Sequence, residues 1–238
     1  MNTCSKNSLH LFMMMAFFLP LSLFTQQGLP EGYQLLYSQD FEKSSKLKGF
    51  EMTDANAWKL SKEADNNCLE LVGGSKYEPR VRSPKNIAII EGKRFGSFVL
   101  EVDLLQTGRE YGHRDLCLFF NMKDPANFYY IHIASIADPH AHNIFLVNDE
   151  ARVAIATKTT KGIQWGDHQW HKVRIEREVN AGSIRLFYDD MNIPIMEAKD
   201  QHFNHGYIGL GSFDDSGKFD NIKIWGPALV PDKKGFFR

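Results

Sequence analysis

The chain has 238 residues, 43% of them hydrophobic and 13% aromatic, and its 28 basic and 29 acidic residues leave a net charge of −1. This balance excludes the strongly basic composition of many nucleic-acid-binding proteins and the acidic composition of solvating tails. The length is sufficient for one sizeable globular core. We therefore expect a single globular domain with no nucleic-acid partner.

The first residues have the layout of a secretory signal peptide. Lys6 supplies a positive charge, and an almost unbroken apolar run follows over residues 9–24. This run is shorter than the roughly 20 residues that a membrane-spanning helix needs. Cys4 precedes the run, whereas a lipoprotein acceptor cysteine would follow it. We predict a signal peptide over residues 1–25 and a secreted or periplasmic protein without membrane association; an uncleaved N-terminal anchor is the alternative.

Short runs rich in aromatic and β-branched residues follow, separated by Gly, Asn, Asp and Pro. No long helical periodicity, fixed repeat or linker divides them. About thirteen such runs indicate an all-β, two-sheet antiparallel jelly-roll sandwich over residues 26–226, with a loosely held tail over 227–238. The predicted strands are residues 33–41, 68–72, 80–90, 98–106, 115–122, 128–134, 143–148, 152–158, 170–179, 183–189, 195–198, 207–213 and 219–225.

Two cysteines, Cys68 and Cys117, lie within the predicted sandwich. They could pair as a disulfide in an oxidising compartment, or they could remain buried free thiols, since Cys117 lies within an apolar run. Their wide spacing argues against a metal site built on thiolates.

Four segments resemble known β-sandwich families. Residues 170–190 (WHKVRIEREVNAGSIRLFYDD) resemble the laminin-G-like pattern, and residues 206–226 (GYIGLGSFDDSGKFDNIKIWG) resemble the closing strands of concanavalin A-like lectin and glucanase jelly rolls. Residues 37–42 (YSQDFE) and 95–105 (FGSFVLEVDLL) resemble the 3-keto-disaccharide hydrolase family. The resemblance implies a concanavalin A-like fold, which carries lectins, glycoside hydrolases, polysaccharide lyases and non-catalytic modules.

The segment 129–149 is the most informative candidate for a site. It contains His132, His140 and His142, and a strand that only filled a core would carry an aliphatic residue at His132. Tyr130 and His132 share one face of the predicted strand, because side chains alternate.

Arginines in neighbouring segments could complete a lyase-like arrangement. Arg80 and Arg82 share a face in the sequence RVRS. Arginine suits the neutralisation of a carboxylate, and histidine and tyrosine suit the base and the acid of a β-elimination. The arrangement resembles that of jelly-roll alginate lyases, although Tyr130 stands where they carry glutamine and their third, tyrosine-bearing strand has no close copy here. The alternative is surface arginines around a hydrogen-bonded core histidine.

We predict a concave face that binds, and in the leading hypothesis cleaves, a polysaccharide or oligosaccharide of neutral or acidic character. The predicted catalytic residues are His132, Tyr130, His113 and Arg82, and the predicted substrate-binding residues are Arg80, Arg114, His140, His142 and Trp165. Trp165 lies in a polar loop flanked by glycines, where a sugar could stack on its ring. A non-catalytic lectin-like module and a metal-assisted hydrolase like the 3-keto-disaccharide family are the alternatives.

Alternate acidic residues offer a second catalytic hypothesis. Glu101 and Asp103 share one face of a strand that resembles the family 16 glycoside hydrolase motif. Such an enzyme needs a second carboxyl group that acts first as an acid and then as a base. Gln106 stands at the position expected for this group, and its amide cannot donate a labile proton. The alternative is a pair of exposed acidic residues on an ordinary strand.

Metal ligation is a further hypothesis. Asp138, His140 and His142 combine carboxylate and imidazole ligands that suit zinc, provided that the backbone there is extended rather than turned. Asp220 occupies a position where related jelly rolls bind a structural calcium, and Asp40 or Glu42 could contribute; the alternative is a strand residue bonded to the backbone. The sequence requires no other cofactor, and it leaves the oligomeric state open.

Overall fold

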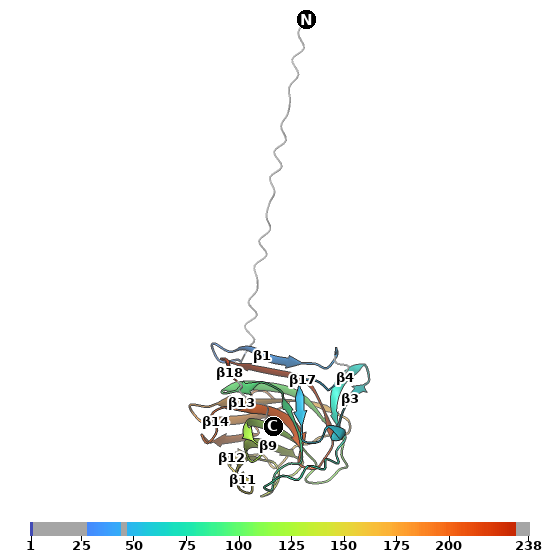
Figure 1. Cartoon of the computed structure of the whole chain (residues 1–238), viewed down its shortest axis with the longest axis vertical. Helices are drawn as coiled ribbons and strands as arrows, with labels where there is room; N and C mark the ends of the chain where they lie inside the picture. The colour runs from blue at the N-terminus through green and yellow to red at the C-terminus, as the bar shows by residue number, and fades with distance from the viewer. Residues whose placement is uncertain (2–27, 44–46, 232–238) are drawn as a thin grey trace.

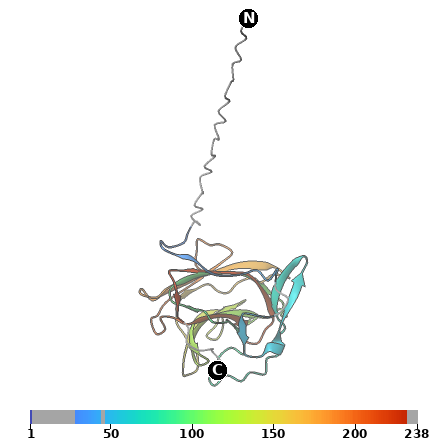
Figure 2. The same ribbon diagram turned by 45° about the horizontal axis from the view of Figure 1, so that its top comes forward.

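The computed structural model describes Met1 and residues 28–43 and 47–231. The strands within residues 34–230 form two large antiparallel sheets that pack face to face (Figure 1). Figure 2 shows the two sheets as separate layers. The predicted signal peptide lies, apart from Met1, outside the described residues. Within the described chain, no helix combines the length and the apolar character needed to span a membrane.

One layer is a nine-stranded sheet, counted over the described residues. Its strands are β1 (Gln34–Gln39), β3 (Trp58–Glu63), β4 (Asn66–Leu71), β7 (Phe98–Gln106), β12 (Ala156–Thr159), β13 (Trp170–Glu178), β14 (Ser183–Tyr188), β15 (Met196–Lys199) and β17 (Gly217–Gly226). Their order is β12-β15-β14-β13-β7-β17-β4-β3, and β1 also pairs with β17.

The other layer is a seven-stranded sheet, again counted over the described part of the chain. Its strands are β2 (Phe50–Met52), β5 (Asn86–Ile90), β8 (Asp115–Asp124), β9 (Asn127–Ala134), β10 (Asn143–Asn148), β11 (Val153–Ala154) and β16 (Tyr207–Ser212). Their order is β11-β10-β9-β8-β16-β5-β2. A two-stranded ribbon of β6 (Arg94–Phe95) and β18 (Leu229–Val230) and a 3₁₀ turn, η1 (Ala55–Ala57), complete the fold.

Two strands, β7 and β10, have the predicted bounds. The strand predicted over 80–90 begins only at Asn86, and the one predicted over 152–158 divides into β11 and β12, which belong to different sheets. In the segment predicted as a loosely held tail, Leu229–Val230 instead pair with Arg94–Phe95. Residues 232–238 lie outside the described residues.

The main core lies between the sheets and follows the predicted alternation. Phe98, Leu100, Val102 and Leu104 of β7 all point inward and are fully buried. Burial of such side chains stabilises the fold by about 1.5–3 kcal/mol each. Both Cys68 and Cys117 are buried free thiols, one on each sheet.

A second apolar layer covers the outer face of the seven-stranded sheet. Val81, in the segment between β4 and β5, packs against this layer. The sheet is therefore buried on both faces. Antiparallel sheets more commonly pack one face on the core and leave the other face in contact with solvent. The layer consists of Ile87, Ile89, Cys117, Phe119, Met122, Phe128, Tyr130, Phe145, Val147 and Tyr207.

A buried arginine joins the two sheets at one end. Arg177 of β13 donates to Oδ1 of Asn121 on β8 at 3.1 Å and to the carbonyls of Asp200 and Phe203, each at 2.9 Å. Its guanidinium also lies 5.3 Å from the ring centroid of Tyr129. All these partners are on the opposite sheet or in the segment that leads to it.

His142 fastens the corner between β9 and β10 in its neutral form. Its Nδ1 accepts a hydrogen bond from the backbone N–H of Ala134 at 3.3 Å, and its Nε2 lies 2.9 Å from Oγ1 of Thr160. Burial, together with the neighbouring His132, lowers the pKa of His142 to about 4. A φ of 51° places this residue in the left-handed region, which asparagine also tolerates.

We expect Arg177→Met to lower the free energy of unfolding by about 3 kcal/mol, because three buried acceptors would lose their donor. Arg80→Met is the matched control, since exposed Arg80 pairs with exposed Asp149 and should contribute less than about 1 kcal/mol. Urea denaturation measures both changes. Equal losses in the two variants would contradict the assigned role of Arg177.

We expect acid to destabilise the protein partly through His142. Below its ordinary pKa of about 6.5 the unfolded chain binds a proton that the folded chain binds only below about 4, so stability falls as pH drops through this window, by up to about 3 kcal/mol. His142→Asn should flatten the slope of unfolding free energy against pH between 6.5 and 4. The control is His168→Asn, because His168 is exposed and also has a positive φ, of 46°; this variant should keep the slope of the parent. Identical slopes in the two variants would refute the role assigned to His142.

Candidate functional site

His132 and Tyr130 project from β9 on the same face, as the alternation predicted, but their surroundings are closed. His132 is 3% exposed and stacks on Phe213 with ring centroids 6.0 Å apart. Tyr130 stacks on Phe145 at 5.1 Å, and its oxygen accepts a hydrogen bond from the guanidinium of Arg152 at 2.6 Å. The prediction that both rings open onto solvent is wrong, because aromatic rings and Arg152 cover them.

Burial also changes the chemistry of Tyr130. It raises the pKa of the phenol far above its ordinary value, although the nearby Arg152 opposes the shift. The phenol is therefore a neutral group held in a packed layer. A polysaccharide cannot reach either ring, so the catalytic roles predicted for them gain no support from the geometry.

Arg80 and Arg82 lie on the same side of the molecule as His132 but outside the aromatic layer. Both are exposed, and Arg80 forms an ion pair with Asp149 in the turn after β10. The carbonyl of Arg82 accepts a hydrogen bond from the backbone N–H of Arg152 at 3.5 Å. The segment between β4 and β5 thus forms part of the covering that separates these arginines from His132.

Arg114 and Trp165 have structural contacts that explain their burial. Arg114 is 4% exposed, and its Nε and Nη2 donate to Oε1 and the carbonyl of Gln106 at 2.5 and 3.1 Å. Trp165 is 2% exposed, and its indole N–H donates to the carbonyl of Arg114 at 2.9 Å. Neither side chain faces solvent, so the substrate-binding roles predicted for both gain no support from the geometry.

The side chains of Asp138, His140 and His142 do not come together. The Asp138 carboxylate accepts a hydrogen bond from the backbone N–H of His140 at 2.6 Å and pairs with the exposed His113. The backbone turns here, with Asp138 bridged to Ala141, and His142 points inward. In the described chain these three residues form no common metal-ligand group.

The paired carboxylates of β7 are engaged in ion pairs across the sheet. Glu101 accepts two hydrogen bonds from Arg174, at 3.0 and 2.5 Å, and Asp103 accepts one from Lys172 at 3.1 Å. Their register partners on β13 explain this arrangement. The interpretation as a surface pair on an ordinary strand fits these contacts.

Asp220 is buried, but its neighbours are hydrogen-bond donors rather than calcium ligands. Its Oδ2 accepts from the amides of Asn66 at 2.7 Å and Asn221 at 3.1 Å. The Asn221 amide also donates to Asp103 at 2.9 Å, so an N–H group lies between two carboxylates where a cation would have to sit. With these amides donating, the hydrogen bonds already account for Oδ2 of Asp220, and the structural calcium stays a prediction.

The polar neighbourhood of His132 includes residues that the sequence analysis missed. Asp115 is fully buried, and its Oδ2 lies 3.2 Å from Nε2 of His132 and 3.1 Å from Sγ of Cys117. Asp215 accepts hydrogen bonds from Tyr111 at 2.8 Å and from the backbone N–H of Asp115 at 2.9 Å. Burial and the charge of Asp115 raise the pKa of Asp215 to about 6. The sequence signal that could have pointed to Asp115 is an acidic residue at the start of an otherwise apolar strand.

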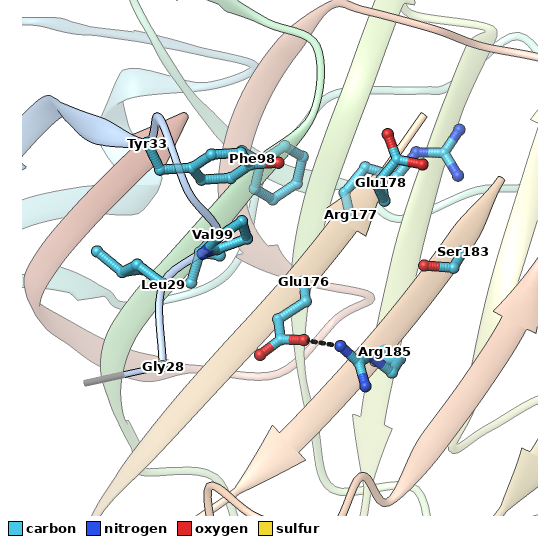
Figure 3. A pocket seen from close by; sticks show the side chains of 11 residues that line it. Gly28, Leu29, Tyr33, Phe98, Val99, Glu176, Arg177, Glu178, Ser183 and Arg185 are labelled. Atoms are coloured by element: carbon cyan, nitrogen blue, oxygen red, sulfur yellow. Dashed lines mark hydrogen bonds and ion pairs between the residues drawn. The ribbon is translucent and has the colours of Figure 1, made fainter. Parts of the chain in front are cut away.

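An open cavity of about 560 Å³ lies on the outer face of the nine-stranded sheet (Figure 3). Residues 28–33 form one wall, and β13 and β14 form the other. Its size is within the range of ligand sites in proteins. The lining residues are Gly28, Leu29, Pro30, Tyr33, Phe98, Val99, Glu176, Arg177, Glu178, Ser183 and Arg185.

The side chains of this cavity combine an aromatic ring with fixed charges. Burial raises the pKa of Tyr33, which remains a neutral phenol. Glu178 accepts a hydrogen bond from the backbone N–H of Ala181 at 2.6 Å, and this bond lowers its pKa. Glu176 pairs with Arg185 across β13 and β14 (Figure 3). No local pattern in the sequence connects Tyr33 with this strand pair, because their proximity depends on the path of residues 28–33.

No family model matches the sequence, and no curated protein matches it. Solved structures match the fold. A carbohydrate-binding module from Bacillus subtilis is 16% identical, with a TM-score of 0.53 and coverage of 75% of this chain and 96% of the module. Lectin I-B4 from Griffonia simplicifolia is 12% identical, with a TM-score of 0.51 and coverage of 80% and 99%.

A third structure, a protein of unknown function with a galectin-like fold from Bacillus subtilis, is 13% identical, with a TM-score of 0.51 and coverage of 87% of this chain and 100% of that one. These likenesses agree with the two sheets and their antiparallel order. The chain has the concanavalin A-like jelly-roll fold.

Proposed function

We propose that the protein is a non-catalytic, exported glycan-binding protein, and that the sugar binds in the cavity between residues 28–33 and strands β13 and β14. The observation that carries this proposal is the combination, in one open cavity, of the Tyr33 ring with the carboxylates of Glu176 and Glu178. The fold that the chain shares with a carbohydrate-binding module and a lectin supports it. Export remains a prediction from residues 1–25.

The chemistry of the cavity suits a sugar ring. A pyranose or furanose has an apolar C–H face that packs on an aromatic ring, and its hydroxyl groups both donate and accept hydrogen bonds. Tyr33 offers the ring, Glu176 and Glu178 accept from hydroxyls, and Arg185 donates. Because Glu178 is already held by the Ala181 N–H, it needs little reorganisation on binding.

The charges favour a neutral glycan over an acidic one. Arg177 lines the cavity but its guanidinium is committed to buried acceptors, and Arg185 is neutralised by Glu176. The formal charges of the two glutamates and two arginines in the lining cancel, and both arginines already have hydrogen-bonded or ionic partners, which leaves little to bind a uronate. The acidic polysaccharide in the sequence-based hypothesis fits this cavity less well.

Binding without cleavage follows from the same carboxylates. A retaining or inverting glycosidase needs a general acid whose pKa is raised, so that it is protonated at neutral pH. The pKa of Glu178 is lowered, and Glu176 is paired with arginine. We therefore propose recognition at this cavity without hydrolysis or elimination.

The purified protein should bind at least one member of a panel of neutral polysaccharides, measured by affinity electrophoresis and calorimetry, without forming new reducing ends or unsaturated products. Tyr33→Ala should weaken that binding at least about tenfold, through loss of the stacking surface, and Glu176→Gln should weaken it as well. Tyr77→Ala removes another half-buried tyrosine, outside the cavity, and should leave the affinity unchanged.

Two results would refute parts of this proposal. If a glycan binds and Tyr33→Ala binds it as tightly as the parent, the cavity is not the site. If no glycan of the panel is retained, or if the glycan is degraded, the non-catalytic binding function is wrong.

A further inference from the structure

Asp115, Cys117 and His132 bring three metal-ligating side chains together on the face opposite the proposed sugar cavity. Asp115 and Cys117 alternate on β8 and so share one face, and Cys117 is the register partner of His132 on β9. Oδ2 of Asp115 lies 3.1 Å from Sγ of Cys117 and 3.2 Å from Nε2 of His132. The three ligand atoms all lie within 4.8 Å of one another.

The polar atoms of this cluster are not fully satisfied. Nδ1 of His132 lies 3.2 Å from the carbonyl oxygen of His140, so this nitrogen carries the hydrogen. Nε2 then points a lone pair toward the Asp115 carboxylate. Both Nε2 and Oδ1 of Asp115 are buried without a hydrogen-bond partner, in residues that are 3% and 0% exposed. Oδ2 of Asp115 already accepts the backbone N–H of Phe213 at 3.0 Å, so a cation, either a proton or a metal ion, would satisfy the two remaining atoms.

The distances and ligand types suit a zinc-like ion. Tetrahedral zinc, with bonds of about 2.0 Å to N and O and about 2.3 Å to S, places neighbouring ligand atoms about 3.3–3.5 Å apart. The two measured distances are only slightly shorter. A histidine that binds metal through one nitrogen usually donates its other N–H to a backbone carbonyl or a carboxylate, as His132 does to His140.

Charge balance favours a metal over a bare carboxylate. The Asp115 carboxylate is fully buried. It accepts hydrogen bonds from the Phe213 N–H and the Cys117 thiol, and the Asp214 and Asp215 carboxylates lie close by, so uncompensated negative charge there is costly. A divalent ion with one carboxylate, one thiolate and a neutral imidazole gives a neutral unit, and the Cys117 proton is released to solvent on binding. The positive Arg152 is held beside this unit rather than within it, clamped 4.7 and 4.4 Å from the ring centroids of Phe145 and Phe213.

We propose that Asp115, Cys117 and His132 bind one divalent transition-metal ion of the zinc class, with the fourth position left to water or to Asp214. The Asp214 carboxylate lies within 4.8 Å of that of Asp115. The ion would fasten β8 to β9 beneath the aromatic layer. This proposal does not depend on the glycan cavity, which lies on the other sheet.

Cobalt(II) binding to the full-length protein tests the proposal. After treatment with a chelator, the protein should bind one equivalent of Co²⁺ and develop a thiolate-to-cobalt charge-transfer band in the near ultraviolet, and one equivalent of Zn²⁺ should remove the band. Cys117→Ser should abolish the band, and Asp115→Asn should weaken Co²⁺ binding at least about tenfold. Cys68→Ser is the matched control, because Cys68 is also a buried free thiol but lies on the other sheet.

Thermal unfolding provides a second readout that does not depend on the spectrum. Zn²⁺ should raise the melting temperature of the parent and of Cys68→Ser, and it should not raise that of Cys117→Ser. Failure of the parent to bind Co²⁺ or Zn²⁺ would overturn the proposal and leave a buried proton-bridged Asp115–His132 pair. A band that persists in Cys117→Ser, or is lost in Cys68→Ser, would also overturn it.

Discussion

The aromatic layer on the outer face of the seven-stranded sheet determines where this protein can meet other molecules. Phe119, Phe128, Tyr130 and Phe145 pack there in a connected set of ring contacts, and Val81 lies against them. A sheet face that is filled in this way cannot form a groove for a polymer. An open cavity lies on the other sheet, where residues 28–33 border β13 and β14, and a smaller one at the end of the seven-stranded sheet lies outside the aromatic layer, beside Arg80 and Asp149.

The same layer gives His132 a different chemical role from the one its sequence context suggests. A histidine in an open trough would exchange protons with a substrate. Here the ring is stacked on Phe213 and aligned by the carbonyl of His140, and its free nitrogen faces Asp115. Such a closed and oriented environment suits a bound cation, whereas the exposed Tyr33 cavity suits a neutral ligand that exchanges with solvent. Our two proposals therefore place recognition and structural stabilisation on opposite faces.

The sequence was sufficient for the fold because the fold depends on local alternation. The inward set of β7 could be read directly from residues 98–106, and the closing strands resemble those of known jelly rolls. The same alternation placed Tyr130 and His132 on one face correctly, with ring centroids 6.3 Å apart. Alternation says nothing, however, about what covers that face.

The site was harder to predict because its surroundings come from distant segments. Covering of His132 depends on Phe213 and Arg152, which no local pattern connects to β9. The polar, glycine-flanked loop of Trp165 suggested exposure, but the indole turns inward to the carbonyl of Arg114. Wide cysteine spacing argued against a thiolate metal site, and that expectation is untested; strand pairing nevertheless brings Cys117 beside His132, which the spacing does not indicate. In each case tertiary contacts decide what a local signal cannot.

Accessibility of the Cys117 thiol tests most directly whether the outer face of the seven-stranded sheet is sealed. The protein would be treated with a water-soluble alkylating reagent in chelator under native conditions, and modification of each cysteine would be followed by peptide mass spectrometry. A sealed face predicts that Cys117 reacts only at the rate of unfolding, more slowly by several orders of magnitude than the same thiol in urea. Rapid native-state labelling of Cys117 would show that the face is open, and the division of roles between the two sheets would then be wrong.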